Sequence, residues 1–392
     1  MILLNGSNIK KMFLDETLFD SVSFNVDSND KIGFIGVNGA GKSTLFKIIT
    51  GDMDYDEGEI FKNKGLRVGY LDQYSVNGSE KSIWEETLTV FADVIEMENQ
   101  LDEIRFDIEN NNGNIDELVK RQTSLQEAFA ERDGFYYKSK VKSTLTGLGF
   151  SEDEFDLCVD KLSGGQKTRV ALGKILLSDA NLLLLDEPTN YLDVQHIEWL
   201  KRYLNEYENA FILISHDIPF LNSVVNIIYH MESQKLDRYV GDYHHFEEVY
   251  AVKKAQLEAA YKRQQQEISE LKDFVARNKA RVSTRNMAMS RQKKLDKMEK
   301  IELMQERPKP QFLFKEARTA GKQLFCTKDL VIGYDEPLSS PLNLEMERGE
   351  KVVLTGANGI GKTTLLKQVA KAVTTNYPDM HMIILLIDER PE

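Results

Sequence analysis

Short runs of consecutive apolar residues recur along the first 240 residues of the chain. The clearest are residues 32–35, 182–185 and 211–214, and glycine or a polar residue follows each of them. Continuous apolar runs of this length, with helical patterns between them, are typical of parallel strands buried on both faces of a sheet. The pattern therefore predicts an α/β fold.

A different periodicity occupies residues 81–147. Apolar side chains recur there at intervals of three and four, the spacing of an amphipathic helix. The sequence Asn-Asn-Asn-Gly at residues 110–113 interrupts this pattern as a turn would. We therefore expect a helical arm, at about residues 81–135, inserted into the α/β domain. The periodic positions are Val90, Phe91, Val94, Met97, Leu101, Ile104 and Ile108.

Residues 247–304 are highly charged and contain neither glycine nor proline. We expect two long helices here, joined by a turn at residues 283–286. A helix of about 30 residues is about 45 Å long, so the pair should protrude as a hairpin. Pro308 and Pro310 are expected to end it.

The segment after residue 324 repeats the opening of the chain. Its apolar residues 352–354 are expected to form a strand before a glycine-rich loop, as residues 32–35 are, and the two loops begin 320 residues apart, at Gly36 and Gly356. Self-similarity of this kind indicates two related modules. The second module is expected to be incomplete, because too few residues follow its loop.

Both glycine-rich loops match the P-loop pattern, Gly-x-x-x-x-Gly-Lys followed by Ser or Thr. In a P-loop, backbone N–H groups surround the phosphates of a nucleotide and a helix N-terminus points at them. Lys42 would reach the β- and γ-phosphates, and Ser43 would ligate Mg²⁺. Lys362 and Thr363 would do the same in the second copy. The alternative is a glycine-rich turn without a ligand. The nucleotide-binding residues that this pattern selects are Gly36, Asn38, Gly39, Gly41, Lys42, Ser43 and Thr44, and Gly356, Asn358, Gly359, Gly361, Lys362, Thr363 and Thr364.

Candidate catalytic residues stand at the ends of the apolar runs. Asp186 suits a contact to Mg²⁺, and Glu187 beside it can polarise a water that attacks the γ-phosphate. His216 follows the next run and can sense or position that phosphate. Gln73 could touch Mg²⁺ or the water. Alone, the carboxylates could mark a solvated turn and the histidine a structural residue. The P-loop upstream favours the catalytic interpretation.

Charge is unevenly distributed along the chain. The formal net charge is −13, yet residues 251–322 hold 19 Lys and Arg against 9 Asp and Glu, a net charge of +10. Between Arg277 and Lys294 there are seven basic residues and no acidic one. A basic insert in an acidic protein predicts a local site for a polyanion.

Other features of the sequence indicate the cellular compartment of the protein. Two cysteines, Cys158 and Cys326, do not make a disulfide framework, so a reducing compartment is expected. No apolar run approaches the ~20 residues that span a bilayer. The first five residues carry neither a basic segment nor a long apolar core, and no signal peptide is expected. We expect a cytoplasmic protein.

Together these motifs resemble the ATP-binding-cassette (ABC) superfamily. Residues 36–44 resemble its Walker A motif, and residues 182–187 resemble Walker B with its catalytic glutamate. Gln73 resembles the residue of the Q-loop, Asp193 that of the D-loop, and His216 the switch histidine. The resemblance implies ATP and Mg²⁺ as ligands and a P-loop NTPase fold of the ABC cassette type.

The sequence Leu-Ser-Gly-Gly-Gln at residues 162–166 is identical to the signature sequence of that superfamily. Its cassettes pair head-to-tail, with ATP held between one P-loop and the signature helix of the partner. Phe13 and Tyr334, at similar distances before the two P-loops, resemble the aromatic residue that stacks on adenine. The resemblance thus adds as nucleotide contacts the residues Ser163, Gly164, Gly165 and Gln166.

Two cassettes in one chain, joined by a charged helical linker, resemble the ABC-F branch. The sequence Thr-Asn-Tyr-Leu-Asp at residues 189–193 resembles the Thr-Asn-His-Leu-Asp of that branch, with Tyr191 in place of His. Members act at the ribosome in translation or antibiotic protection, which implies a ribosomal partner here. The basic tip of the hairpin, residues 272–300, independently suits rRNA or tRNA phosphates. The alternative is a solvated coiled coil.

The tail departs from this pattern, since the ABC resemblance covers only about residues 1–367. Residues 385–392, Leu-Leu-Ile-Asp-Glu-Arg-Pro-Glu, resemble a fragment of the transcription termination factor Rho. We interpret the tail as a fusion or assembly artefact. The alternative is simple divergence.

These observations predict three parts. They are an ABC cassette at residues 1–241, a basic hairpin linker at 242–312, and a partial second cassette with the Rho-like tail at 323–392. We expect an ATPase whose activity is reduced by the truncation, with a homodimer through the first cassette as a further option. Two other functions stay open: the ATPase subunit of a membrane transporter, or a nucleotide-gated binding protein with little hydrolysis.

Overall fold

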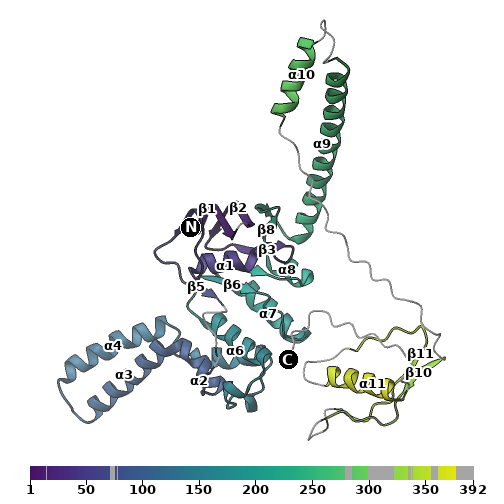
Figure 1. The fold of residues 1–392 in the computed structure, drawn as a ribbon. Helices are drawn as coiled ribbons and strands as arrows, with labels where there is room; N and C mark the ends of the chain where they lie inside the picture. Colours follow the sequence, from purple (N-terminus) through teal and green to yellow (C-terminus); the bar gives the residue numbers. More distant parts are fainter. Residues whose placement is uncertain are drawn as a thin grey trace. The chain divides into compact units, whose positions relative to one another are not determined.

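The computed structural model describes residues 1–14, 16–70, 76, 78–278, 285–298, 322–333, 337, 339–354 and 361–376 (Figure 1). The chain divides into two compact units, Met1–Glu306 and Arg307–Glu392.

The first unit contains two sheets. An antiparallel sheet has the order β2-β1-β4. A six-stranded sheet has the order β5-β6-β7-β3-β8-β9, in which all neighbours are parallel except the hairpin β8–β9. The strands are β1 (Ile2–Phe13), β2 (Glu16–Asp27), β3 (Lys31–Gly36), β4 (Glu57–Lys62), β5 (Val68–Tyr70), β6 (Leu182–Asp186), β7 (Ala210–Ile214), β8 (Ile227–Glu232) and β9 (Lys235–Val240).

The three apolar runs are confirmed as the neighbouring parallel strands β6, β7 and β3. Successive side chains of β6 enter two different clusters: Leu182 and Leu184 pack with α1 (Lys42–Thr50), whereas Leu183 and Leu185 pack with α6 (Gly164–Leu177). Side chains alternate across a strand, so a strand covered on both faces must be apolar at every position. The α/β prediction is confirmed.

The predicted helical region is confirmed as a series of helices. Between α3 and α4 lies the predicted break, and Asn114 caps α4 by accepting a hydrogen bond from the N–H of Asp116 at 3.2 Å. The two helices lie side by side (Figure 1) and form a small core of Val94, Leu101 and Phe129 together with Tyr137 of the following helix. The helices up to residue 224 are α2 (Ile83–Leu88), α3 (Ala92–Glu109), α4 (Ile115–Glu131), α5 (Tyr137–Gly147), α6, α7 (Val194–Glu206) and α8 (Ile218–Val224), with short 3₁₀ turns at Thr89–Phe91, Glu152–Glu154 and Val159–Lys161.

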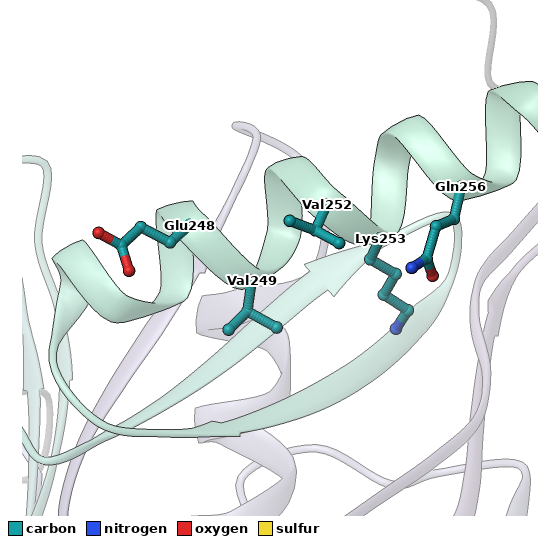
Figure 2. Close-up of a pocket in the computed structure, with 5 residues that line it drawn as sticks. All are labelled: Glu248, Val249, Val252, Lys253 and Gln256. Carbon is teal, nitrogen blue, oxygen red and sulfur yellow. The ribbon is translucent and has the colours of Figure 1, made fainter.

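The first helix of the linker, α9 (Tyr243–Asn278), is fixed to the β8–β9 hairpin at its base. The Tyr250 hydroxyl donates to Glu232 Oε1 at 2.7 Å, and Lys253 Nζ donates to Asp237 Oδ2 at 2.8 Å. Figure 2 shows this part of the helix, with Lys253 directed toward the hairpin. An open surface hollow of about 390 Å³ is lined here by Glu248, Val249, Val252, Lys253 and Gln256.

The second linker helix, α10 (Arg285–Lys297), packs on α9. The Arg291 guanidinium lies 3.6 Å from the centre of the Phe274 ring, and Lys294 pairs with Glu267 at 2.6 Å. The turn predicted at residues 283–286 is wrong for residues 285 and 286, which are helical, and residues 283 and 284 lie outside the described residues. Turn-forming residue types were outweighed by packing, because Ala288, within the first turn of α10, is buried.

The second unit contains the antiparallel pair β10 (Gln323–Cys326) and β11 (Glu345–Glu347), and the helix α11 (Lys362–Asn376). The strand predicted at residues 352–354 is wrong: this segment is not a strand, and Val353 is 81% exposed. The equivalent strand of the first unit, β3, is held between β7 and β8. In the described part of the second unit, no strand pairs with residues 351–354.

Candidate functional site

The loop after β3 has the conformation that its glycines allow. Gly41 is the N-cap of α1 and has a φ of 105°, in the left-handed region. A Cβ atom on Gly41 would lie 2.9 Å from side-chain atoms of Leu18 and Phe19. Another residue would therefore be both strained and crowded here. The N-terminal N–H groups of α1 point toward the loop, as phosphate binding requires.

Lys42 is the first residue of α1, and its side chain is buried. Its ammonium donates to the carbonyl oxygens of Gly36 at 2.7 Å and Val37 at 3.3 Å. Burial lowers the pKa of Lys42, and the carboxylates of Glu187 and Asp186 oppose that shift. A buried ammonium gains from an anionic partner, so the loop is prepared for a phosphate.

The structure brings Ser43 and Asp186 together, although 143 residues separate them. The Ser43 hydroxyl donates to Asp186 Oδ2 at 2.6 Å. Ser43 belongs to α1 and Asp186 ends β6, two strand positions away from β3 in the sheet. A hydroxyl and a carboxylate are the hard oxygen ligands that Mg²⁺ prefers.

Glu187 follows directly, with a φ of 50° that is uncommon outside glycine. Its Oε2 accepts a hydrogen bond from the N–H of His216 at 3.3 Å. Its Oε1 is buried, lies 3.4 Å from His216 Nε2, and has no hydrogen bond in the described structure. Burial raises the pKa of Glu187, against the effect of His216. This carboxylate has the spare acceptor capacity and the raised basicity of a general base.

The signature sequence opens α6. Ser163 is its N-cap and forms a capping box with Gln166: the Ser163 oxygen accepts from the N–H of Gln166 at 3.3 Å, and Gln166 Oε1 accepts from the N–H of Ser163 at 3.1 Å. A Cβ atom on Gly164 would meet nothing within 4 Å, whereas one on Gly165 would lie 2.8 Å from Tyr191 Cδ1. The open side at Gly164 leaves the helix N-terminus accessible to an anion.

Other predicted positions are only partly described. Phe13 ends β1 and is 46% exposed, with Lys11 Nζ 5.4 Å from its ring centre, so one aromatic face can receive a base. In the second unit, Gly361 has a φ of 85°, and Lys362, Thr363 and Thr364 open α11. The predicted site residues that lie outside the described residues are Gln73, Tyr334, Gly356, Asn358 and Gly359.

The comparisons with known proteins fit this site. A family model described as "ABC transporter" matches residues 19–190 and 339–380, and a second model with the same description matches residues 229–314. The ABC transporter ATP-binding protein YfmM of Bacillus subtilis is 58% identical over 370 residues, covering 94% of this chain and 71% of that protein.

The chain belongs to the ABC transporter family. This ABC protein is also similar to ABC transporter F family member 5 of Arabidopsis thaliana, at 34% identity over 374 residues. That match covers 92% of this chain and 53% of the Arabidopsis protein. The chain therefore spans only part of these curated relatives. Among solved structures, an ATP binding subunit of an ABC transporter is similar at 20% identity and a TM-score of 0.44, covering 61% of this chain and 90% of that one.

The nucleotide of this ABC protein is ATP, bound with Mg²⁺. The residues present fit both ligands. Lys42 and the N-terminus of α1 would hold the phosphates, and Ser43 and Asp186 would hold the metal. In the described residues, no group of three or more His, Cys, Asp or Glu side chains could hold a metal alone. Phosphate oxygens are expected to complete the coordination, as is usual for Mg²⁺. None of the described helices is long and apolar enough to cross a membrane.

Three contacts near the candidate site escaped the sequence-based prediction. Asp193 caps α7 by accepting from the N–H of His196 at 3.2 Å, and its carboxylate lies 2.5 Å from His196 Nδ1. Tyr191 packs on Gly165. Arg169 donates to the carbonyl oxygen of Leu148 at 2.9 Å. An Asp before a helix is a readable N-cap signal. The other two contacts join segments distant in sequence, and no local pattern marks them.

Proposed function

We propose that this protein is an ABC-F-type ATPase that acts at the ribosome, in translation or in antibiotic protection. The observation that carries the proposal is the basic helix pair α9–α10, which follows an ATP-binding cassette in the same chain. The similarity to a protein named as an F family member supports the assignment.

The exposed basic groups of the helix pair suit a nucleic-acid backbone. Lys272, Arg277, Lys293 and Lys297 are exposed on α9 and α10. Each Lys or Arg that neutralises a phosphate releases condensed counterions, so affinity for RNA depends steeply on salt. A linker of this kind would give a soluble cassette a polyanionic partner without any base-specific contact.

The same proposal gives roles to the residues of the P-loop and of the β6 end. Bound Mg²⁺ would supply electrostatic stabilisation of the phosphates. Lys42 would bind the β- and γ-phosphates, and Glu187 would accept the proton of the water that attacks the γ-phosphate. His216, 3.4 Å from Glu187, would orient that carboxylate and contact the γ-phosphate.

A second candidate is the ATPase subunit of a membrane transporter, which the name of the B. subtilis relative favours. It requires a membrane partner docked on the first cassette. It gives no role to the basic helix pair.

Co-sedimentation with ribosomes in the presence of ATP tests the proposal. The variant Arg277→Glu, Lys293→Glu, Lys297→Glu should lose ribosome binding while its ATP affinity in calorimetry stays unchanged. A matched control, Lys62→Glu, Lys64→Glu, Lys235→Glu, changes the same charge at exposed positions of the cassette. It should bind as the wild type does.

The second part of this experiment measures how ribosome binding depends on salt concentration. Binding of the wild type should weaken by about tenfold or more between 50 and 200 mM salt if several phosphates are contacted. Salt-insensitive sedimentation, equal losses in both triple variants, or no binding at any salt concentration would overturn the ribosomal assignment. ATP binding would remain.

A further inference from the structure

The two glycines of the signature have different surroundings, although they are adjacent on α6. At Gly164 an added Cβ atom would meet open space. At Gly165 it would collide with Tyr191, with Cδ1 at 2.8 Å, Cγ at 3.1 Å and Cβ at 3.3 Å. One glycine therefore leaves the helix N-terminus open to a ligand. The other makes room for an aromatic side chain of the same chain.

Tyr191 is held in place by the loop that follows the catalytic carboxylate. The N–H of Asn190 donates to the carbonyl oxygen of Glu187 at 3.1 Å, and the N–H of Leu192 donates to that of Thr189 at 3.2 Å. Tyr191 itself has a φ of 69°, in the left-handed region. Leu192 is buried in the core beneath α6 and α7.

The next residue completes the anchoring, since Asp193 caps α7. Non-glycine residues at positive φ persist only where the surrounding contacts determine them, and such residues gather at functional sites. Glu187 and Tyr191 are both of this kind. Through these contacts the loop links the end of β6 to the first turn of α6.

We propose that Tyr191 is a positioning residue that fixes the signature turn, Ser163–Gln166, relative to Glu187. Its side chain covers Gly165 and orients the N-terminal N–H groups of α6, while the open side at Gly164 receives the phosphate. This inference rests on the proposed hydrolytic function for its catalytic consequence. The contact of Tyr191 with Gly165 does not depend on hydrolysis and can be tested on its own.

The direct test uses thermal unfolding of the full chain without nucleotide. Gly165→Ala should lower the unfolding midpoint of the first unit by several degrees, because the new methyl group collides with Tyr191. In the Tyr191→Ala background the same change should be neutral or stabilising, since Ala favours a helix over Gly. Gly164→Ala is the matched control and should not lower the midpoint in either background. Additivity of Gly165→Ala and Tyr191→Ala would overturn the contact.

Amide hydrogen exchange then tests what the side chain does. In Tyr191→Ala, the amides of residues 164–167 should exchange several times faster than in the wild type. In Tyr191→Phe, which keeps the ring, they should exchange at the wild-type rate. Unchanged exchange in Tyr191→Ala would show that the side chain fixes nothing.

Enzyme kinetics test whether the contact between Tyr191 and Gly165 affects catalysis. Tyr191→Ala should lower kcat by about tenfold, because small displacements of positioned groups are costly, while ATP affinity at the P-loop stays within about twofold. Tyr191→Phe should restore kcat. Equal kcat in the Ala and Phe variants would refute the positioning role. If the wild type shows no hydrolysis, the ATPase proposal fails. The unfolding and exchange results still decide whether Tyr191 fixes the signature turn.

Discussion

The two P-loops of this chain end in the same local structure but stand in different surroundings. In both, a glycine at positive φ precedes a helix that begins at lysine, Gly41 with α1 and Gly361 with α11. In both, the first helical hydrogen bond spans 2.9 Å, from Leu45 to Gly41 and from Leu365 to Gly361. The sequence around each loop is thus enough to start a helix there.

The segments before the two loops are different. Phe34 of β3 is 1% exposed between β7 and β8, whereas Val353 is 81% exposed in a segment that is not a strand. Asp186 and Glu187 reach the first loop only because β6 lies in the same sheet as β3. A P-loop is therefore a local motif, but its catalytic site is a product of the whole sheet.

The largest expected effect is on the free energy of unfolding, to which these two side chains should contribute very differently. Phe34→Ala should destabilise the first unit by about 3–5 kcal/mol, through lost burial and the cavity left behind. Val353→Ala should change stability by less than about 0.5 kcal/mol, because its side chain is already in water. Urea unfolding followed by circular dichroism measures both changes, and Phe34→Leu serves as the conservative control. Comparable losses in the two alanine variants would remove the distinction between the loops.

The second largest effect is expected on ATP hydrolysis, which depends on a residue of the first unit. Glu187→Gln should lower ATP hydrolysis by about 100-fold or more, the usual contribution of a general base. ATP binding should persist, because Lys42 and α1 are unchanged. In the wild type the rate should fall as the pH drops through the raised pKa of Glu187, because only the ionised carboxylate accepts a proton. Steady-state phosphate release as a function of pH measures both effects. Robust hydrolysis by Glu187→Gln would remove this residue from the mechanism.

A smaller effect is expected on nucleotide affinity. Lys42→Ala should weaken ATP binding by about 10- to 100-fold, because a charge-assisted phosphate contact worth about 1.5–3 kcal/mol is lost. Lys362→Ala should have the weaker effect, since no strand pairs with the segment before its loop among the described residues. Titration calorimetry with Mg-ATP compares the two. A larger loss in Lys362→Ala would reverse the ranking of the loops.

Most of the first unit could be predicted from the sequence, because its signals are local or strongly periodic. The runs that became β3, β6 and β7, the helical arm and the P-loop helices all follow from spacing and residue type. The juxtaposition of Ser43 with Asp186 followed only indirectly, because both residues were assigned to the same Mg²⁺ ion. The packing of Tyr191 on Gly165 did not follow from any sequence signal, because it depends on a left-handed backbone within an irregular loop.

The wrong predictions have a common physical origin. Residues 352–354 have the composition of a strand but lack neighbours to pair with in the described part of their unit. Arg285 and Asn286 have turn-like neighbours in sequence but join α10, which packs on α9. In both places the outcome depended on tertiary contacts rather than on local preference, since they are absent at residues 352–354 in the described part of the unit and present along α10. The domain boundaries and the roles of the individual site residues stay predictions.

The smallest expected effect is on the pH dependence of stability, and it tests the surroundings of Glu187 directly. Burial raises the pKa of Glu187 in the folded state. A carboxyl group with a raised folded pKa favours folding while it is protonated, and this contribution is lost as the pH rises through the folded pKa. At neutral pH the ionised carboxylate therefore costs stability.

Glu187→Gln removes that charge and should raise the thermal unfolding midpoint of the first unit at pH 8. The difference from the wild type should shrink as the pH falls below the raised pKa. Glu208→Gln, at an exposed position of the same unit, is the matched control and should show little change at either pH. A Glu187→Gln variant that is less stable than the wild type at pH 8 would mean that its contacts with His216 outweigh the cost of burial. The raised pKa would then be wrong.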